Sequence, residues 1–257
     1  MAAGHAPSIR ASTTMSGHPR VLLRLTSEFQ LLVGSEELSV PRGVQRLLAF
    51  LAIAGSPVAR SRVAGQLWLD VPEWRALGNL RSALWRLRRV QRPIVRSLDD
   101  RIALDGGVVV DLEELTRLTG NLSTHPDSDA LSRVSQLVAA RDLLPGWEDE
   151  WIIIERERFR ELRIHALERA SRSLLERGYH AAAMDAALAA VEAEPFRDSA
   201  QRLVVQAYLS EGNAASALRA YLAFRDLMEV ELGIEPSDAM QQLVADLHPA
   251  EARLTHR

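Results

Sequence analysis

The stretch NLRSALWRLRRVQRP, residues 79–93, contains five arginines and no acidic residue. In and just before it, leucines recur three and four residues apart, at Leu77, Leu80, Leu84 and Leu87. This spacing predicts one apolar face of a helix that begins near Pro72 and runs to about Val90. The polar side chains gather on the opposite face and its flank: Arg75, Asn79, Arg81, Ser82, Arg86, Arg88, Arg89 and Arg92. We therefore expect a helix that packs through leucines and presents arginines to its surroundings.

Short elements surround this helix in an informative order. Alternating apolar residues predict an antiparallel meander of three strands, in the segments VLLRL (21–25), FQLLV (29–33) and ELSV (37–40). Helical spacing then predicts a helix that ends at Gly55 and a second short helix that follows Ser61. After Pro93, two short strands around a turn at residues 99–100 predict a β-hairpin. Three strands, three helices and a hairpin in this order predict a winged helix-turn-helix.

The second half of the chain is rich in Ala, Leu, Glu and Arg and has no strand signal. Two segments that start at Leu174 and Tyr208 align at an offset of 34 residues, which matches Gly178 with Gly212. This offset is the tetratricopeptide period. Small residues at Ala183, Ala190 and Ala217 suit close helix packing, although Glu229 replaces the expected proline. Further helices are expected at roughly 130–143 and 150–176, with a capping helix at 237–247.

The sequence therefore predicts an α+β winged helix-turn-helix followed by an all-α, tetratricopeptide-like helical domain. The charge divides in the same way, because residues 1–110 carry a net charge of +7 and residues 111–257 carry −10. A basic first half joined to an acidic second half fits nucleic-acid binding in the first half alone. The expected organisation is a disordered tail (1–19), a winged-helix domain (20–112), a helical domain (113–248) and a second tail (249–257).

The arginine helix carries the main functional hypothesis, which is binding to double-stranded DNA. An α-helix fits the major groove, where Arg can bond guanine and Asn can bond adenine through two hydrogen bonds. Asn79, Arg86 and Arg89 are expected to read bases, whereas Arg81, Arg88 and Arg92 are expected to hold phosphates. A solvated helix face is the alternative. Trp85 is expected to pack against the hairpin, which forms the wing.

Other candidates for DNA contact flank the arginine helix. Arg60 and Arg62 lie at the start of the second short helix, where free N–H groups can meet a phosphate. Arg101, after the hairpin turn, is expected either to reach a minor groove or to pair with Asp99. The complete set of expected DNA-binding residues is Arg60, Arg62, Arg75, Asn79, Arg81, Ser82, Arg86, Arg88, Arg89, Arg92 and Arg101.

The segment LLPGWEDEWIIIERERFREL, residues 143–162, combines two tryptophans with a dense run of charge. One interpretation is a contact surface for another protein, with Trp147, Trp151 and Glu155 as its candidate residues. The favoured interpretation is that the two tryptophans anchor the first long helix against the DNA-binding domain. The charged residues would then form pairs on a solvated helix face.

Composition argues against several kinds of chemistry. The chain has no cysteine, which excludes disulfides and thiolate nucleophiles, and no lysine, which excludes a P-loop motif. Its seven histidines do not show metal-binding spacing. We therefore expect no cofactor, no metal and no enzymatic activity. No apolar run reaches the roughly 18 residues that span a bilayer, and no signal peptide is visible, so we expect a cytoplasmic protein associated with the bacterial nucleoid.

Two segments resemble a known family. Residues 47–89, LLAFLAIAGSPVARSRVAGQLWLDVPEWRALGNLRSALWRLRR, resemble the OmpR-type winged helix of the Streptomyces antibiotic regulatory protein family, including its LW-x-D-x-P turn. Residues 193–237, from AEPFRDSA to GIEPS, are similar to the bacterial transcriptional activator domain that follows it in those proteins. Together the resemblance covers about residues 20–247.

The resemblance implies a transcriptional activator that binds direct repeats in promoters, often of antibiotic or other secondary-metabolite gene clusters. It implies recruitment of RNA polymerase through the sigma and alpha subunits, and a dimer or side-by-side pair on DNA. It places Asn79, Arg81, Ser82, Arg86 and Arg89 on the recognition helix and Arg101 on the wing. Because no nucleotide-binding, sensor or receiver domain is visible in the sequence, control by ATP or aspartyl phosphorylation is not expected.

Two alternatives remain open on the sequence. A repressor that releases DNA on binding a small molecule would share all the DNA chemistry. A helical-repeat scaffold that uses the winged helix only for protein contacts would be favoured if the arginines of the helix were paired with acidic residues of the second domain.

Overall fold

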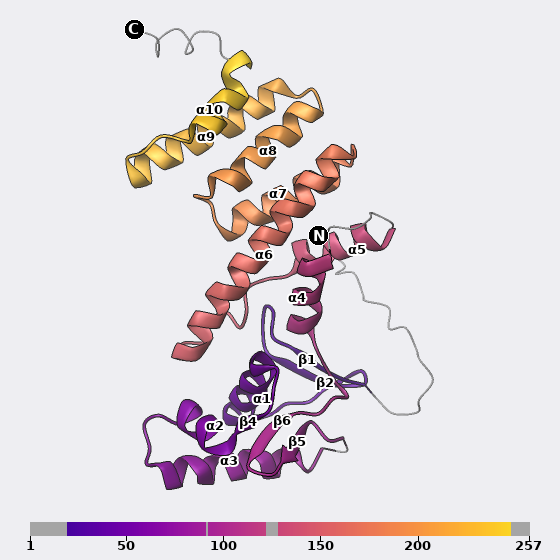
Figure 1. Cartoon of the computed structure of the whole chain (residues 1–257), viewed down its shortest axis with the longest axis vertical. Coiled ribbons are helices and arrows are strands. Elements are labelled where there is room, and N and C mark those ends of the chain that lie inside the picture. Colours follow the sequence, from indigo (N-terminus) through magenta and orange to yellow (C-terminus); the bar gives the residue numbers. More distant parts are fainter. Residues whose placement is uncertain (1–19, 91, 122–127, 248–257) are drawn as a thin grey trace, which may run out of the picture.

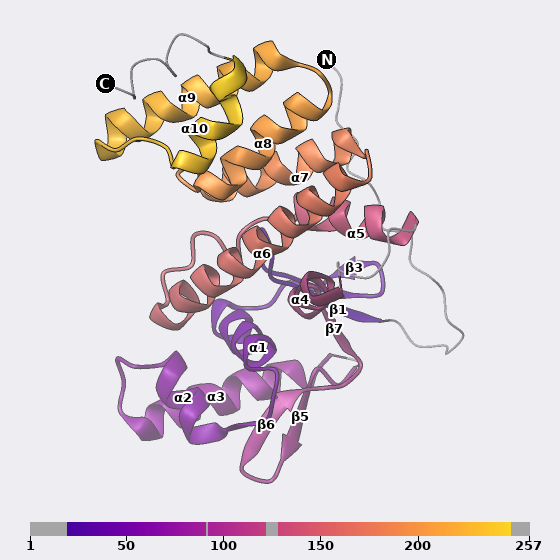
Figure 2. The ribbon, with the colours of Figure 1, turned by 45° about the horizontal axis from the view of Figure 1, so that its top comes forward.

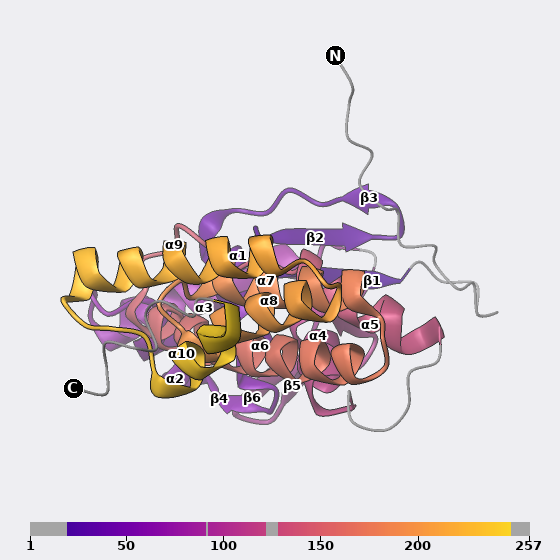
Figure 3. The ribbon, with the colours of Figure 1, turned by 90° about the horizontal axis from the view of Figure 1, so that it is seen from above.

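The first part of the fold is a small sheet. The structure, a computed structural model, describes residues 20–90, 92–121 and 128–247. The sheet has the strand order β3-β2-β1-β7, and its strands are β1 (Val21–Arg24), β2 (Gln30–Val33), β3 (Glu36–Glu37) and β7 (Val108–Val110). Figure 3 shows β1, β2 and β3 side by side, so the meander is present, but its third strand is Glu36–Glu37 rather than the predicted residues 37–40. The sequence missed β7, which runs parallel to β1.

A three-helix unit with a second sheet follows. Its elements are α1 (Arg42–Ala54), β4 (Val58–Ala59), α2 (Arg60–Leu67), α3 (Glu73–Leu87), β5 (Val95–Leu98) and β6 (Arg101–Leu104). Strands β5 and β6 form the predicted hairpin, and β4 adds to the other edge of β6. The fully buried side chains of Leu48, Leu80 and Ile102 show that α1, α3 and the hairpin share one core.

The arginine helix α3 is shorter than the sequence predicts. It ends at Leu87 rather than near Val90, and the N–H groups of Arg89 and Val90 donate to the carbonyls of Arg86 and Leu87 at 3.2 and 3.1 Å in a closing turn. Its buried face is also centred differently from the four predicted leucines, on Ala76, Leu80, Ala83 and Leu87. Leu77 and Leu84 lie at the edges of this face and are partly exposed.

The remainder of the described chain is helical. The helices are α4 (Asp111–Asn121), α5 (Ser128–Ala139), α6 (Glu150–Glu176), α7 (His180–Ala193), α8 (Asp198–Ser210), α9 (Ala214–Leu232) and α10 (Asp238–Val244), with a final 3-10 turn at Ala245–Leu247. Helices α6 to α9 pack in succession, and α10 packs on α8 and α9 as the predicted cap. In Figure 1, α3 lies at the opposite end of the molecule from α9 and α10.

The predicted 34-residue repeat is visible in the geometry. Gly178 and Gly212 follow α6 and α8 with φ angles of 78° and 74°, a left-handed conformation that glycine adopts without a steric penalty. One residue later, the N–H of Tyr179 donates to the carbonyl of Leu174 at 3.0 Å. The N–H of Asn213 donates to the carbonyl of Tyr208 at 2.9 Å. Ala183 and Ala217, the aligned small residues, are both fully buried. The first helix of each pair, α6 or α8, therefore ends in the same way before the chain turns into α7 or α9.

Helix α4 is tied to the first sheet by the carboxylate of Asp111. This carboxylate accepts hydrogen bonds from the backbone N–H groups of Leu25 and Thr26 at 2.9 and 3.0 Å, and from the Thr26 hydroxyl at 2.7 Å. Asp111 follows β7 directly and is the first residue of α4. Figure 2 shows α4 between the sheet and α6, so this helix joins the two halves of the fold.

The segment between α5 and α6 is not helical, whereas the sequence predicts helix to residue 143; it has a bridge at Leu143 and a turn at residues 145–146. Leu143 forms a β-bridge with Thr26, and the N–H of Leu144 donates to the carbonyl of Leu25 at 2.8 Å. The guanidinium of Arg156 donates to the carbonyls of Leu143, Leu144 and Trp147 at 2.7, 2.6 and 2.8 Å. Leu25 and Thr26, just after β1, therefore hold the segment on one side, and Arg156 of α6 holds it on the other.

Both tryptophans of this region contact the winged-helix half. Trp147 is only 7% exposed, stacks on Phe29 with ring centroids 6.1 Å apart, and lies under the guanidinium of Arg42 at 3.6 Å. Trp151 meets Phe50 edge-on at 5.4 Å. The structure thus places them in the anchoring role, and only Glu155 of the three protein-contact candidates lies outside these ring contacts, half-buried on α6.

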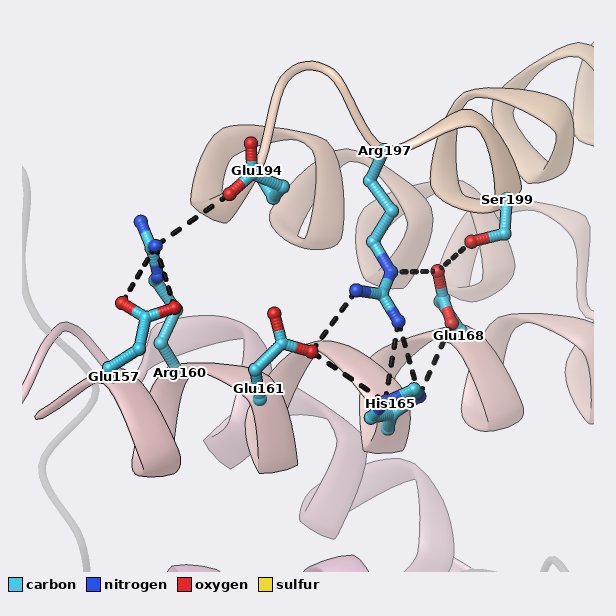
Figure 4. Close-up of polar contacts among 8 residues, drawn as sticks. All are labelled: Glu157, Arg160, Glu161, His165, Glu168, Glu194, Arg197 and Ser199. Atoms are coloured by element: carbon cyan, nitrogen blue, oxygen red, sulfur yellow. Dashed lines mark hydrogen bonds and ion pairs between the residues drawn. The ribbon is translucent and has the colours of Figure 1, made fainter. Parts of the chain in front are cut away.

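A network of charges joins α6 to the start of α8, as Figure 4 shows. Arg197 donates to the carboxylates of Glu168 and Glu161 at 2.8 and 3.1 Å, and Glu168 also accepts from the Ser199 hydroxyl. Burial alone would lower the pKa of Arg197, but the hydrogen bond and the charge of Glu168 raise it above its ordinary value. His165 lies beside the same guanidinium, at 3.2 Å.

Trp147→Ala is expected to lower the free energy of unfolding by about 3–5 kcal/mol, because it empties a buried ring site. Trp74→Ala, at a side chain that is 68% exposed, is the matched control and is expected to change it by less than about 0.5 kcal/mol. Urea unfolding followed by circular dichroism measures both. Equal losses would show that the Trp147 contact does not stabilise the fold.

Glu168→Ala is expected to cost about 2–4 kcal/mol of unfolding free energy, because Arg197 and Ser199 lose their shared acceptor. The control is Glu157→Ala on the same helix, whose carboxylate is 57% exposed and pairs with Arg160 at 2.8 Å. Exposed ion pairs contribute less than about 1 kcal/mol. Thermal and urea unfolding of the two variants compare a buried with an exposed ion pair. If Glu168→Ala loses no more unfolding free energy than Glu157→Ala, the Glu168 network does not stabilise the fold.

Candidate nucleic-acid interface

Helices α2 and α3 form a helix-turn-helix whose second helix is exposed on its outer side. Residues 68–72 connect the two helices, and Val63, Ala64 and Leu67 of α2 are buried against the core that α3 shares. Trp68, which follows α2 directly, is partly buried in that core. In Figures 1 and 2, α3 and the β5–β6 hairpin lie side by side at the end of the molecule remote from α8, α9 and α10.

A broad, open groove of about 1010 Å³ lies along the exposed side of α3. Its lining residues are Arg60, Trp74, Arg75, Gly78, Asn79, Arg81, Ser82, Leu84, Trp85, Arg86 and Arg88. Five of them are arginines and none is acidic, so the groove is strongly positive. Seven of the eleven expected DNA-binding residues line it, which shows that the fold brings most of that set together.

The five arginines of the groove are not neutralised within the described residues, where none of them forms an ion pair with an acidic side chain. Arg60 donates to the hydroxyl of Ser97 at 2.9 Å, which links the start of α2 to the wing strand β5. Arg75 lies near the ring of Trp74, with 5.4 Å between guanidinium carbon and ring centroid. The Ser82 hydroxyl donates to the Gly78 carbonyl at 3.0 Å, so its proton is already used within α3.

The other four expected residues lie around the groove rather than in it, and they are Arg62, Arg89, Arg92 and Arg101. Arg62 is exposed on α2, and Arg101 is exposed on β6 opposite Leu98. Arg92 lines a separate cavity of about 330 Å³ between the end of α3 and the wing. Arg101 and Asp99, both in the described part of the chain, do not form an ion pair, so the alternative role considered for Arg101 is not realised.

Two tryptophans in the groove were not among the expected site residues. Trp74 is 68% exposed and Trp85 is 54% exposed. The expectation that Trp85 packs against the wing is wrong, because the ring is largely open to solvent and lies under the guanidinium of Arg89 at 3.9 Å from its centroid. The sequence does indicate that Trp85 lies near the polar face of the helix, since it follows Ser82 by three residues, about one helical turn.

Over the residues that the structure describes, no group of three or more His, Asp and Glu side chains is arranged to hold a metal ion. The same residues contain no helix that is both long enough and apolar enough to cross a membrane.

Comparison with known proteins agrees with this arrangement. Residues 110–248, more than half of the chain, match the family described as the bacterial transcriptional activator domain. The chain belongs to this family. It is 30% identical over 225 residues to the Regulatory protein AfsR of Streptomyces coelicolor, and 27% identical over 237 residues to the Regulatory protein AfsR of Streptomyces griseus. The resemblance to the Streptomyces antibiotic regulatory protein family is thereby confirmed.

These matches cover most of this chain but only a small part of each relative. They cover 81% and 86% of this chain but only 22% and 24% of the two relatives, so the chain spans about a quarter of their length. A solved structure of Mycobacterium tuberculosis EmbR in complex with a low-affinity phosphopeptide is also similar, with a TM-score of 0.68 at 18% identity, over 88% of this chain and 64% of that one. This likeness confirms the predicted fold class of this family member.

Removal of a groove arginine is expected to leave the stability of the fold unchanged. Arg81→Ala and Arg86→Ala should each change the free energy of unfolding by less than about 0.5 kcal/mol, because both side chains are exposed and lack an acidic partner. Leu80→Ala, on the buried face of the same helix, should cost about 2–5 kcal/mol. If an arginine variant unfolds as readily as Leu80→Ala in urea, the arginine has a structural role.

Proposed function

We propose that this chain is a sequence-specific DNA-binding transcriptional activator. The observation that carries the proposal is the groove of α3, which holds five arginines without an acidic neighbour in its lining. Affinity for DNA comes mainly from neutralised phosphates, and sequence is read at the base edges in the groove. A positive helix face at the end of an elongated molecule meets both needs, because Arg75, Arg81, Arg86 and Arg88 are exposed and α3 lies at the end opposite α9 and α10 in Figure 1.

The side chains of the groove divide into two roles in this proposal. Asn79 and Arg86 face outward from α3 and read bases, because their amide and guanidinium groups can each make two hydrogen bonds to one base. Arg81 and Arg88 bind phosphates beside them. Arg60 binds a phosphate at the start of α2, where its contact with the wing also fixes its position. Arg62, Arg75, Arg92 and Arg101 extend the positive surface over neighbouring phosphates and toward the minor groove.

The winged helix of residues 20–112 is the DNA-binding part in this proposal, and the acidic helical part of residues 113–248 contacts RNA polymerase through its sigma and alpha subunits. Since one recognition helix reads only a few base pairs, two copies bind a direct repeat side by side. The AfsR relatives are regulatory proteins, and this supports a role in controlling a gene cluster for antibiotic or other secondary-metabolite synthesis.

One observation weighs against the scaffold alternative. That alternative would be favoured by arginines of α3 paired with acidic residues of the helical part, but the groove arginines lack ion pairs in the described structure. Glu161 and Glu168 of α6 pair instead with Arg197 at the start of α8, as Figure 4 shows. The positive charge of α3 is therefore available to an external anion.

The two arginine roles predict different losses. Arg86→Ala should weaken specific binding by about 1–3 kcal/mol and relax the preference at one base pair. Arg88→Ala should weaken binding to all duplexes and lower the slope of log K against log salt concentration by about 1. Fluorescence anisotropy titrations with the protein's own promoter region, over a range of salt concentrations, measure both effects.

Arg177→Ala is the control for these titrations, because Arg177 is exposed at the end of α6, far from α3. It should bind DNA as the parent chain does. If neither Arg86→Ala nor Arg88→Ala alters binding, the proposed DNA interface is wrong. In vitro transcription with and without the protein then separates an activator, which raises transcript levels, from a repressor, which lowers them.

A further inference from the structure

The last arginine of the helix region is held by an aromatic ring rather than by the helix. Helix α3 ends at Leu87, so the backbone of Arg89 lies in the closing turn. Its side chain folds back over Trp85, four residues earlier, with 3.9 Å between the guanidinium carbon and the ring centroid. Trp85 lines the groove, whereas Arg89 does not. The ring therefore connects Arg89, which does not line the groove itself, to the groove surface.

A stacked guanidinium keeps its hydrogen-bonding capacity. The ring contacts the flat face of the guanidinium, whereas all five N–H donors point outward in its plane. Within the described residues, Arg89 does not form an ion pair, so no acidic group occupies those donors. Arg42 provides a contrast, because it stacks on Trp147 at 3.6 Å but has the carboxylate of Asp149 at 3.8 Å.

The exposure of Trp85 also points to a ligand-directed role. A tryptophan that is 54% exposed contributes little to the core, and here it shares one groove with Asn79 and Arg86. A long arginine side chain loses rotamer freedom when it binds a base. A ring that already restricts this side chain removes part of that cost before DNA is bound.

We propose that Trp85 is a positioning residue for Arg89, and that the stacked pair presents the guanidinium to the O6 and N7 atoms of one guanine in the major groove. This inference rests on the proposed function. Trp85 acts through Arg89 and does not itself select the base. The other exposed pair of the groove, Trp74 and Arg75, is more loosely stacked at 5.4 Å and has no such role.

The test uses the full chain and a DNA duplex that the chain enriches from a pool of randomised duplexes. Each base pair of that duplex is replaced in turn, and binding is measured by fluorescence anisotropy. The variants are Arg89→Ala, Trp85→Leu, Trp85→Phe and the double variant Trp85→Leu with Arg89→Ala. Trp74→Leu is the matched control, because it also removes an exposed tryptophan from the groove. Circular dichroism confirms that each variant is folded.

Arg89→Ala should reduce discrimination at one G·C pair by about tenfold. Trp85→Leu should reduce discrimination at that same pair by about two- to fivefold, the range expected for an exposed cation–π contact. Trp85→Phe should retain most of it, and the double variant should match Arg89→Ala. Trp74→Leu should leave discrimination at this pair unchanged.

Several results would overturn the inference while the proposed function stands. These are an unchanged Trp85→Leu variant, a loss at a different base pair, losses that add in the double variant, or an Arg89→Ala variant that still discriminates. Failure of the parent chain to enrich any duplex would instead overturn the proposed function, and with it the inference. The two failures are therefore distinguishable in one experiment.

Discussion

The hydrogen bonds from Arg156 to three carbonyl oxygens of residues 143–147 hold the junction on which both halves of the structure depend. These carbonyls lie outside any helix or regular sheet ladder, and a buried carbonyl without a donor is costly. One guanidinium of α6 supplies donors to them, while Leu25 and Thr26, just after β1, pair with the other side of the segment. This arrangement fixes where α6 begins, and it directs Trp147 and Trp151 toward the winged helix.

A single hydrophobic core continues through this junction. It extends from Val21 in the first strand to Ala200 in α8, without a break between the winged helix and the helical stack. Asp149 reinforces it at the surface by pairing with Arg42 and Arg46 of α1. The position of the arginine groove is therefore set relative to the helical stack, which lies at the other end of the molecule in Figure 1. In the proposed function, this arrangement separates the DNA-binding surface from the helical stack.

Arginine, which supplies all the side-chain positive charge apart from histidine, has three different environments in this fold. Arg163 is 4% exposed and donates to the carbonyl of Leu137 at 3.0 Å, and burial lowers the pKa of its guanidinium. Arg197 is held by two carboxylates. The arginines of the α3 groove have neither kind of partner among the described residues. The same residue type thus supports the helical half through internal acceptors and leaves its donors free at α3, where an external anion can use them.

The sequence by itself determined the elements whose signals are local. The leucine spacing of α3 and the hairpin rest on residues that are close in the sequence. The 34-residue repeat rests on a match between two segments, including Gly178 and Gly212. The structure contains all three. The tertiary structure alone decided the features that need distant partners. Strand β7 exists because β1 lies beside it, and residues 140–147 are not helical because Leu25, Thr26 and Arg156 bind them. The end of α3 at Leu87, which helical periodicity placed too late, is also a tertiary outcome, because a pattern of side chains does not contain the packing that stops a helix.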